Sequence, residues 1–138
     1  MWPLSVLARL AFDFGVWSAG QIPITFICEE AHRYVPSEKN ADGSSVGRIL
    51  SRIAKEGRKY GVSLGLITQR PSDLAEGVLS QCGTIISMRL NNDRDQAFVK
   101  AAMPEGARGF LDSIPALRNR ECIICGEGVS IPIRVAFD

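Results

Sequence analysis

The amino-acid sequence predicts an α/β fold with a largely parallel β-sheet. Short apolar runs typical of strands alternate with segments whose apolar residues recur every three or four positions, as on one face of a helix. With 138 residues, 46% of them hydrophobic and 22% charged, the chain has the size and composition of one globular domain. We therefore expect residues 1–138 to form a single domain.

The first half of the chain is predicted to open with a helix. Its apolar residues recur at helical spacing: Leu4, Leu7, Leu10 or Ala11, Phe14 and Trp17. Residues 22–28 form an apolar run that predicts a strand buried on both faces. Residues 35–43, rich in Pro, Ser, Asn, Asp and Gly, are predicted to form a loop. Ser44 or Ser45 can cap a second helix, which we expect to end at Tyr60 before a glycine.

The second half continues the alternation. Residues 62–68 predict another strand, and the proline at the start of residues 71–73 opens a third helix. Three further elements are expected: a strand at 84–88, a helix at 93–103 and a short helix at 107–112. Two closing strands, 120–125 and 131–137, are expected to form a hairpin across residues 126–128.

Charge and hydropathy exclude several classes of protein. Sixteen Lys and Arg against fifteen Asp and Glu leave a net charge of +1, so any contact with nucleic acid must come from local patches. The apolar runs are far shorter than the roughly 20 residues that span a bilayer. The first residues lack a basic segment and a cleavage site for a signal peptide. We expect a cytoplasmic protein without a membrane partner.

The four cysteines are expected to be reduced and buried as small apolar side chains. Cys122 and Cys125 have the spacing of half a zinc site, but a structural zinc site needs four ligands. The other candidates, Cys28, Cys82 and His32, are scattered along the chain. Residues three apart on a strand also point to opposite faces. The sequence therefore predicts no zinc.

Two adjacent carboxylates, Glu29 and Glu30, follow the first predicted strand. Desolvation and mutual repulsion oppose their ionisation, and a bound divalent cation would relieve both. In that hypothesis Glu29 holds Mg²⁺, directly or through water, and Glu30 orients or deprotonates an attacking water. The alternative is that the strand ends in a solvated acidic loop. His32 alone is interpreted as a hydrogen-bonded loop histidine rather than a ligand or base.

Gln69 follows the second predicted strand, at residues 62–68. The carboxyl ends of neighbouring parallel strands lie side by side, and functional groups collect there, so we expect Gln69 to approach Glu30. A neutral amide at that place suits a sensor of a γ-phosphate. The alternative is an ordinary polar residue before a proline turn.

Basic residues mark the helix between these two strands. Arg48, Arg52, Lys55 and Lys59 form one stripe, opposite the apolar residues Val46, Ile49, Leu50, Ile53 and Ala54. A solvated helix face explains the stripe, and a phosphate-binding face toward DNA is the alternative. Arg58 lies off the stripe in Glu-Gly-Arg-Lys-Tyr-Gly, where two glycines indicate a tight turn. An arginine held there can reach the phosphates of a neighbouring subunit.

Three motifs together resemble the HerA family of ATPases, RecA-like motors that pump DNA and are related to FtsK. They are Pro-Ile-Thr-Phe-Ile-Cys-Glu-Glu-Ala-His-Arg-Tyr, which ends at Tyr34, then Glu-Gly-Arg-Lys-Tyr-Gly and Thr-Gln-Arg-Pro-Ser, which ends at Ser72. Their order and spacing are specific, whereas the acidic motif alone is not. The resemblance extends over the whole chain.

The resemblance implies a role for each matching residue. Glu29 and Glu30 occupy the Walker B position, with Glu29 at the metal and Glu30 as the catalytic glutamate. Gln69 matches the polar sensor, and Arg58 matches the arginine that reaches the adjacent subunit, with Arg52 and Arg70 as alternatives. The resemblance also implies ATP, Mg²⁺ and a hexameric ring around DNA. Family members often work with a NurA-type nuclease in DNA repair.

The chain departs from the family pattern because no Gly-x-x-x-x-Gly-Lys-Ser/Thr loop occurs in it. It therefore resembles the carboxy-terminal half of a motor domain, an incomplete RecA-like three-layer fold without its P-loop strand. Such a chain is a truncated piece, a gene fragment or a degenerate member, and alone it should not hydrolyse ATP. The strands that flank the missing one, 62–68 and 84–88, would expose open edges. We expect them to pair with each other, to swap elements or to oligomerise.

Three other functions compete with this interpretation. A non-catalytic fragment or pseudo-ATPase would serve assembly or partner binding. A metal-dependent hydrolase using Glu29, Glu30 and His32 would leave Gln69 and the Glu-Gly-Arg-Lys-Tyr-Gly turn unexplained. A DEAH-box helicase is disfavoured, because the first acid is Glu and no further helicase motifs follow.

Overall fold

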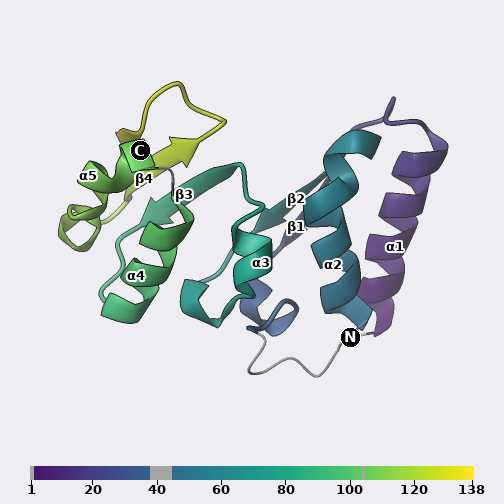
Figure 1. Ribbon diagram of the computed structural model, residues 1–138, viewed down its shortest axis with the longest axis horizontal. Coiled ribbons are helices and arrows are strands. Elements are labelled where there is room, and N and C mark those ends of the chain that lie inside the picture. Colours follow the sequence, from purple (N-terminus) through teal and green to yellow (C-terminus); the bar gives the residue numbers. More distant parts are fainter. Residues whose placement is uncertain (1, 38–44, 104) are drawn as a thin grey trace. The chain divides into compact units, whose positions relative to one another are not determined.

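The expected alternation of helices and strands is present in the computed structural model, which describes residues 2–37, 45–103 and 105–138 (Figure 1). The chain divides into two compact units, Met1–Gln81 and Cys82–Asp138. The first unit contains α1 (Trp2–Trp17), β1 (Ile24–Cys28), α2 (Ser45–Glu56), β2 (Val62–Leu66) and α3 (Glu76–Leu79). The second contains β3 (Thr84–Met88), α4 (Asp93–Ala102), α5 (Arg108–Leu111), β4 (Glu121–Gly126) and β5 (Ile133–Ala136). Most of the predicted loop at 35–43 lies outside the described residues.

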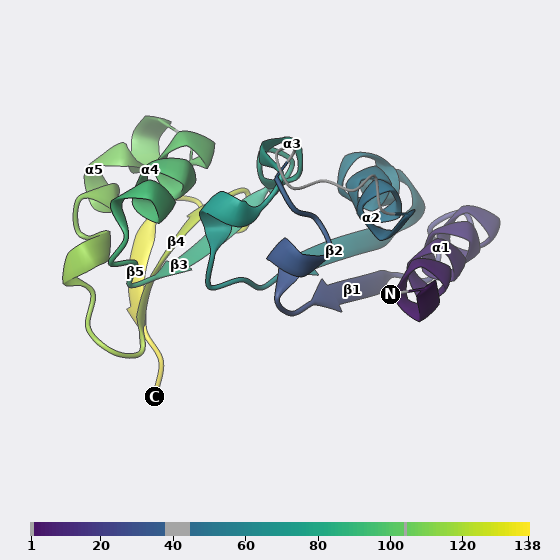
Figure 2. The ribbon, with the colours of Figure 1, turned by 90° about the horizontal axis from the view of Figure 1, so that it is seen from below.

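In the first unit, β1 and β2 form a parallel pair, and α1 and α2 run side by side (Figures 1 and 2). The register aligns Ile24 with Val62 and Cys28 with Leu66. The helix α2 buries Val46, Leu50 and Ile53, as its apolar stripe predicts. The strand at 22–28 was expected to be buried on both faces, and this is wrong for β1. Burial alternates along β1, with Cys28 buried and Ile27 64% exposed, because the helices contact only one face.

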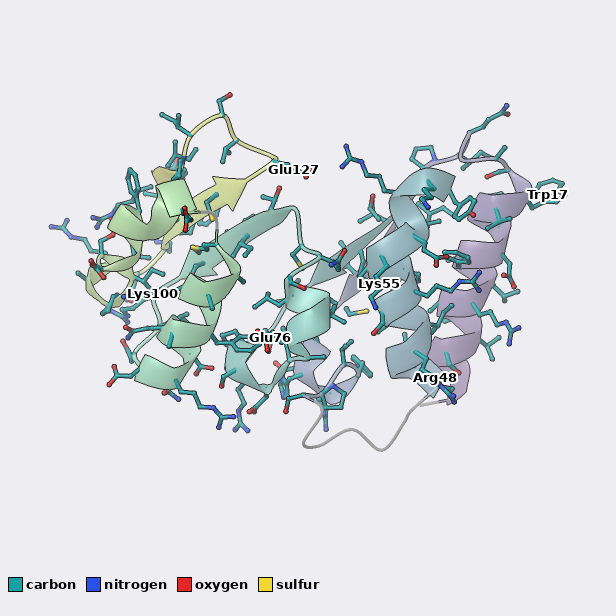
Figure 3. All side chains as sticks on the ribbon, viewed as in Figure 1. Trp17, Arg48, Lys55, Glu76, Lys100 and Glu127 are labelled. Atoms are coloured by element: carbon teal, nitrogen blue, oxygen red, sulfur yellow. The ribbon has the colours of Figure 1, made fainter. Side chains whose placement is uncertain are left out.

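The opening helix forms as predicted, but its buried face is not the stripe that predicts it. Ala8 and Phe12 are buried, whereas Leu7, Leu10 and Trp17 are more than half exposed. Figure 3 shows Trp17 projecting away from the end of α1. Small residues decide which face packs: a side chain at Gly15 would collide with Val62 and come within 2.7 Å of the Tyr60 carbonyl oxygen. Close packing therefore selects the face with Gly15 over the bulkier one.

The second helix ends earlier than predicted, at Glu56, and a 3₁₀ turn follows over Gly57–Tyr60. Gly57 is buried, and a side chain there would collide with the backbone carbonyl of Val62. Gly61 caps the turn at φ 68°, a left-handed conformation that favours glycine. The two glycines thus hold a tight turn around Arg58, as the sequence predicts.

The third predicted helix is interrupted. A 3₁₀ turn over Pro71–Asp73 is followed by the short α3. Leu74 is extended and buried between the two, where it forms a bridge with Pro36. The amide of Ala75 donates a hydrogen bond to the carbonyl of Val35 at 3.0 Å. These tertiary contacts outweigh the helical tendency of the segment.

The second unit is an antiparallel sheet in the order β3-β4-β5, with the closing hairpin as predicted. The expectation of a largely parallel sheet is therefore wrong for this unit, since the short hairpin connection joins antiparallel strands. Its core is formed by Val99, Met103, Ala107, Ile114, Leu117, Ile123 and Cys125. In the described residues β2 and β3 belong to different sheets, so they do not pair with each other, which was one of three expected outcomes.

The cysteines are free thiols, and Cys28, Cys122 and Cys125 are buried as expected. Cys82 is only half-buried, in contrast to the expectation. Burial raises the pKa of each of the four thiols. They are therefore protonated and weakly nucleophilic at neutral pH.

The ion pair between β4 and β5 predicts an acid-dependent contribution to stability. The Glu121 carboxylate accepts hydrogen bonds from the Arg118 amide and from the Arg134 guanidinium, each at 2.6 Å. These two donors lower the pKa of Glu121. A lowered folded pKa stabilises the fold above the ordinary glutamate pKa, and this stabilisation is lost as the pH falls through the folded value.

We expect Glu121→Gln to lower the urea midpoint at pH 7. Between pH 5 and pH 3 the midpoint of this variant should fall less steeply with pH than that of the unmodified chain. Arg134→Gln should flatten the decline less, because the Arg118 amide still donates to the carboxylate. The measurement is urea denaturation of the chain at several pH values. An equally steep decline in Glu121→Gln and the unmodified chain would contradict the assignment.

Candidate functional site

The acidic pair begins immediately after β1. Glu29 and Glu30 are both exposed, and Glu30 has a left-handed backbone with φ 51° and ψ 44°. Ala19 and Arg120 also have positive φ values. A glutamate in this conformation costs on the order of 1 kcal/mol, and such strain persists only where surrounding contacts hold it. The chain then turns into the 3₁₀ segment Ala31–Arg33.

Backbone hydrogen bonds fasten this strained turn to the end of β2. The Ile67 amide donates to the Cys28 carbonyl, and the Ala31 amide donates to the Ile67 carbonyl, both at 2.9 Å. The carboxyl ends of the two parallel strands therefore lie side by side, as the sequence predicts. Gln69 lies on the exposed turn that follows β2.

The two strand ends are bridged by His32 and Thr68. The Nδ1 atom of His32 lies 3.1 Å from the Thr68 hydroxyl oxygen, and its Nε2 atom lies 3.6 Å from a Glu30 carboxylate oxygen. The Thr68 hydroxyl also accepts a hydrogen bond from the Arg70 amide at 3.0 Å. This confirms His32 as a hydrogen-bonded loop histidine. Thr68 was not among the sequence-predicted candidates, although a threonine before a proline turn is a residue type that bonds nearby amides.

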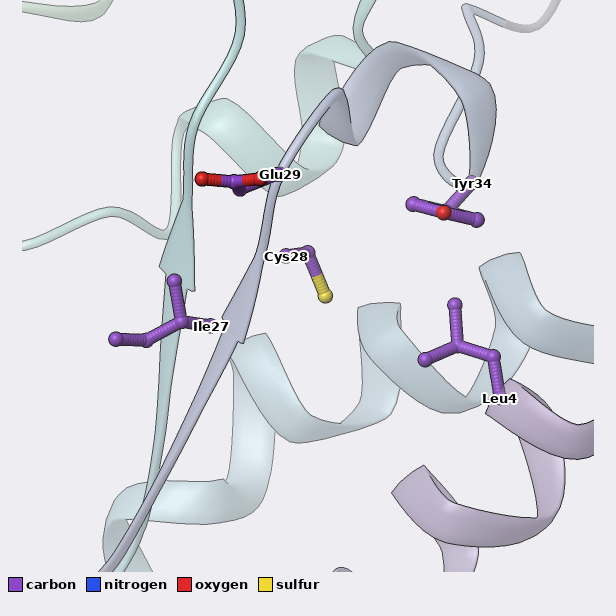
Figure 4. Close-up of a pocket in the computed structure, with 5 residues that line it drawn as sticks. All are labelled: Leu4, Ile27, Cys28, Glu29 and Tyr34. Atoms are coloured by element: carbon purple, nitrogen blue, oxygen red, sulfur yellow. The ribbon is translucent and has the colours of Figure 1, made fainter.

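A hollow of about 430 Å³ lies beside the acidic pair (Figure 4). Its lining is formed by Leu4, Ile27, Cys28, Glu29 and Tyr34. Figure 4 shows Cys28 pointing toward Leu4 and Tyr34, and Ile27 pointing to the other side of β1. Glu29 is the charged residue among these five.

The exposed carboxylates suit a magnesium ion that is shared with phosphate. In the described ranges, no three His, Cys, Asp or Glu side chains gather into a group that could hold a metal ion. Mg²⁺ is commonly held by one or two carboxylates together with phosphate oxygens and water. Glu29 and Glu30 are hard oxygen donors, so they fit the protein share of such a site.

The basic stripe is exposed along α2 and the turn that follows it, and Figure 3 labels Arg48 and Lys55 on this helix. Arg52 is held against the first unit: its guanidinium lies 4.5 Å from the ring centroid of Phe12 and its Nε donates to Glu56 at 3.3 Å. Arg58 is exposed on the glycine-bounded turn. Arg70 lies 3.9 Å from the Asp73 carboxylate.

No helix in the described part of the chain is long and apolar enough to cross a membrane.

Curated relatives of this chain are helicases. It is 42% identical over 113 residues to the DNA double-strand break repair helicase HerA of Pyrococcus furiosus, covering 82% of this chain and 20% of the relative. It is 38% identical over 117 residues to a probable HerA helicase of Methanocaldococcus jannaschii, covering 84% of this chain and 22% of the relative. The chain thus spans about a fifth of the length of these relatives.

The solved structures show the fold. The genome packaging NTPase B204 of Sulfolobus turreted icosahedral virus 2, in complex with ATP-gammaS, superposes with a TM-score of 0.71. The match covers 94% of this chain and 59% of B204 at 16% identity. No protein-family model matches the chain. This chain is therefore a relative of the HerA helicases over one segment of about a fifth of their length, as its motifs predict.

Proposed function

We propose that this chain is part of an ATP-hydrolysing DNA translocase of the HerA type and carries the acidic half of its ATP site. The observation that supports this proposal most strongly is the parallel pairing of β1 with β2, which brings the Glu29–Glu30 and Thr68–Gln69 segments to one edge of the sheet. In α/β sheets, ligands bind at the carboxyl ends of the strands, which form this edge. We further propose that the chain is one partial RecA-like domain.

Each residue then has a specific task. Glu29 would hold Mg²⁺ through water, and Glu30 would take the proton of the attacking water. Gln69 contacts the γ-phosphate as a sensor. When bound with ATP, Mg²⁺ neutralises charge on the phosphate oxygens. The exposure of both carboxylates supports these tasks, because a water and a nucleotide must reach them.

Arg58 is the residue that we propose as a finger toward the ATP of a neighbouring subunit. It projects from a turn that Gly57 and Gly61 hold in place, which supports a positioned role. An arginine at such a position stabilises charge on the transferring phosphate. The subunits would form a hexameric ring.

DNA is the proposed partner of that ring, in the cytoplasm, with a NurA-type nuclease as a second partner. The exposed stripe of Arg48, Arg52, Lys55 and Lys59 is the candidate DNA-facing surface. Of these four, Arg52 has its guanidinium over Phe12, so the remaining three would supply most of the phosphate contacts.

The phosphate-binding loop is the part of the site that these 138 residues lack. We propose that other parts of the parent protein supply it, and that the isolated chain does not hydrolyse ATP. This same observation favours a second candidate, a non-catalytic fragment or pseudo-ATPase that serves as an assembly module.

One measurement separates these candidates, and a second tests whether the isolated chain lacks part of the ATP site. Steady-state ATP hydrolysis by the full-length protein that contains this chain should be stimulated by double-stranded DNA. Calorimetry of the 138-residue chain with Mg-ATP should detect no binding. A full-length protein that neither binds nor hydrolyses ATP would overturn the motor and favour the assembly module.

A further inference from the structure

We propose that His32 is a positioning residue that couples the Glu30 carboxylate to the turn after β2 through the Thr68 hydroxyl. The proposal rests on the function proposed above, in which Glu30 acts on the attacking water. The bridge lies within the first unit and joins side chains that follow different strands. Its two distances are 3.1 Å from Nδ1 to the Thr68 oxygen and 3.6 Å from Nε2 to the Glu30 carboxylate.

The hydrogen-bond donors and acceptors around His32 determine which ring nitrogen carries the hydrogen. The Thr68 oxygen already accepts from the Arg70 amide, and its hydroxyl hydrogen is available for Nδ1 of His32. In that arrangement the neutral ring carries its hydrogen on Nε2, facing the Glu30 carboxylate. The opposite tautomer would place an unprotonated Nε2 against a carboxylate, two acceptors without a hydrogen between them. The bridge therefore favours the Nε2–H form.

The surroundings allow the bridge to transmit a displacement. The His32 side chain is 18% exposed, whereas that of Glu30 is 47% exposed, so the ring is the more confined of the two. The backbone of the Glu30 turn is fastened to Ile67 by the Ala31 amide. A ligand that contacts Gln69 would shift the neighbouring Thr68 hydroxyl and, through the ring, the carboxylate of Glu30.

The longer distance suits a contact that tightens during turnover. At 3.6 Å, Nε2 and the Glu30 oxygen are a few tenths of an ångström beyond hydrogen-bond length. Catalytic hydrogen bonds are often long before the substrate binds.

The bridge itself can be tested without nucleotide. His32 is the sole histidine of the chain, so the imidazole signals in an NMR spectrum belong to this ring. In ¹⁵N-labelled chain at pH 8, two-bond ¹H–¹⁵N spectra report the tautomer of one ring. We expect the Nε2–H form to dominate, Thr68→Val to reduce its population and Thr68→Ser to retain it. Thr25→Val, on the exposed side of β1, is the matched control and should change nothing. A dominant Nδ1–H form in the unmodified chain would overturn the bridge without any variant.

The coupling to turnover is tested in the full-length protein. We expect Thr68→Val and His32→Asn each to lower kcat by about 10- to 100-fold with KM for ATP unchanged, as for other residues that orient a catalytic group. Thr68→Ser should restore turnover, and the double variant should lose little more than either single variant. Additive losses, or a full loss in Thr68→Ser, would overturn the coupling.

The two tests fail independently. An unmodified full-length protein without ATP turnover would overturn the proposed function and the role of the bridge in turnover, while the tautomer still reports whether the bridge exists. Normal DNA-stimulated turnover with the wrong tautomer would overturn the bridge and leave the proposed function standing.

Discussion

Replacing Glu30 by glutamine is expected to lower ATP turnover by the full-length protein by about 10²- to 10⁴-fold. Glutamine keeps the size of the side chain and one acceptor oxygen but cannot take a proton from water. Nucleotide binding should persist, because in the proposed site Mg²⁺ is held through Glu29. The measurement is steady-state hydrolysis with and without double-stranded DNA, together with calorimetric binding of Mg-ATP.

Glu29→Gln and Glu76→Gln complete this experiment. Glu29→Gln should weaken binding of Mg-ATP, which Glu30→Gln leaves intact. Glu76 is an exposed carboxylate on α3, labelled in Figure 3, and its replacement should change neither quantity. Unchanged turnover in Glu30→Gln would remove Glu30 from the role of base.

The second large effect is a loss of folding stability, which we expect for Phe12→Ala in α1. The Phe12 ring is 1% exposed and meets the Tyr60 ring edge to face, with centroids 5.4 Å apart. The Arg52 guanidinium lies over the same ring. Truncating a buried phenylalanine typically costs about 3–5 kcal/mol, through lost burial and the cavity left behind. Urea denaturation should show this loss as a lower midpoint.

Phe14→Ala is the matched control for this substitution. Phe14 lies two residues along the same helix, on its outer side, and is 38% exposed. Its ring contacts Trp17, which is itself 81% exposed, so its truncation should cost far less than that of Phe12. Equal losses in the two variants would mean that α1 packs through its outer face, contrary to the structure.

Residue types at the candidate site could be found from the sequence, but their connections could not. Carboxylates after an apolar strand and a polar residue after the next strand identify Glu29, Glu30 and Gln69 as candidates, because strand ends meet in a parallel sheet. Thr68 was missed, since its partner His32 lies 36 residues away along the chain. Only the register of β1 against β2 decides that these two side chains meet.

The positions of most helices and strands, the parallel β1–β2 pair, the closing hairpin and the HerA resemblance follow from the sequence, because periodicity, glycine turns and motif order are local properties. Tertiary structure decided the features that depend on contacts between segments distant in the sequence. It turned the small face of α1 inward around Gly15, interrupted the third helix at Leu74, and made the sheet of the second unit antiparallel. Shape complementarity between distant segments determines these features, and no single stretch of sequence carries that information.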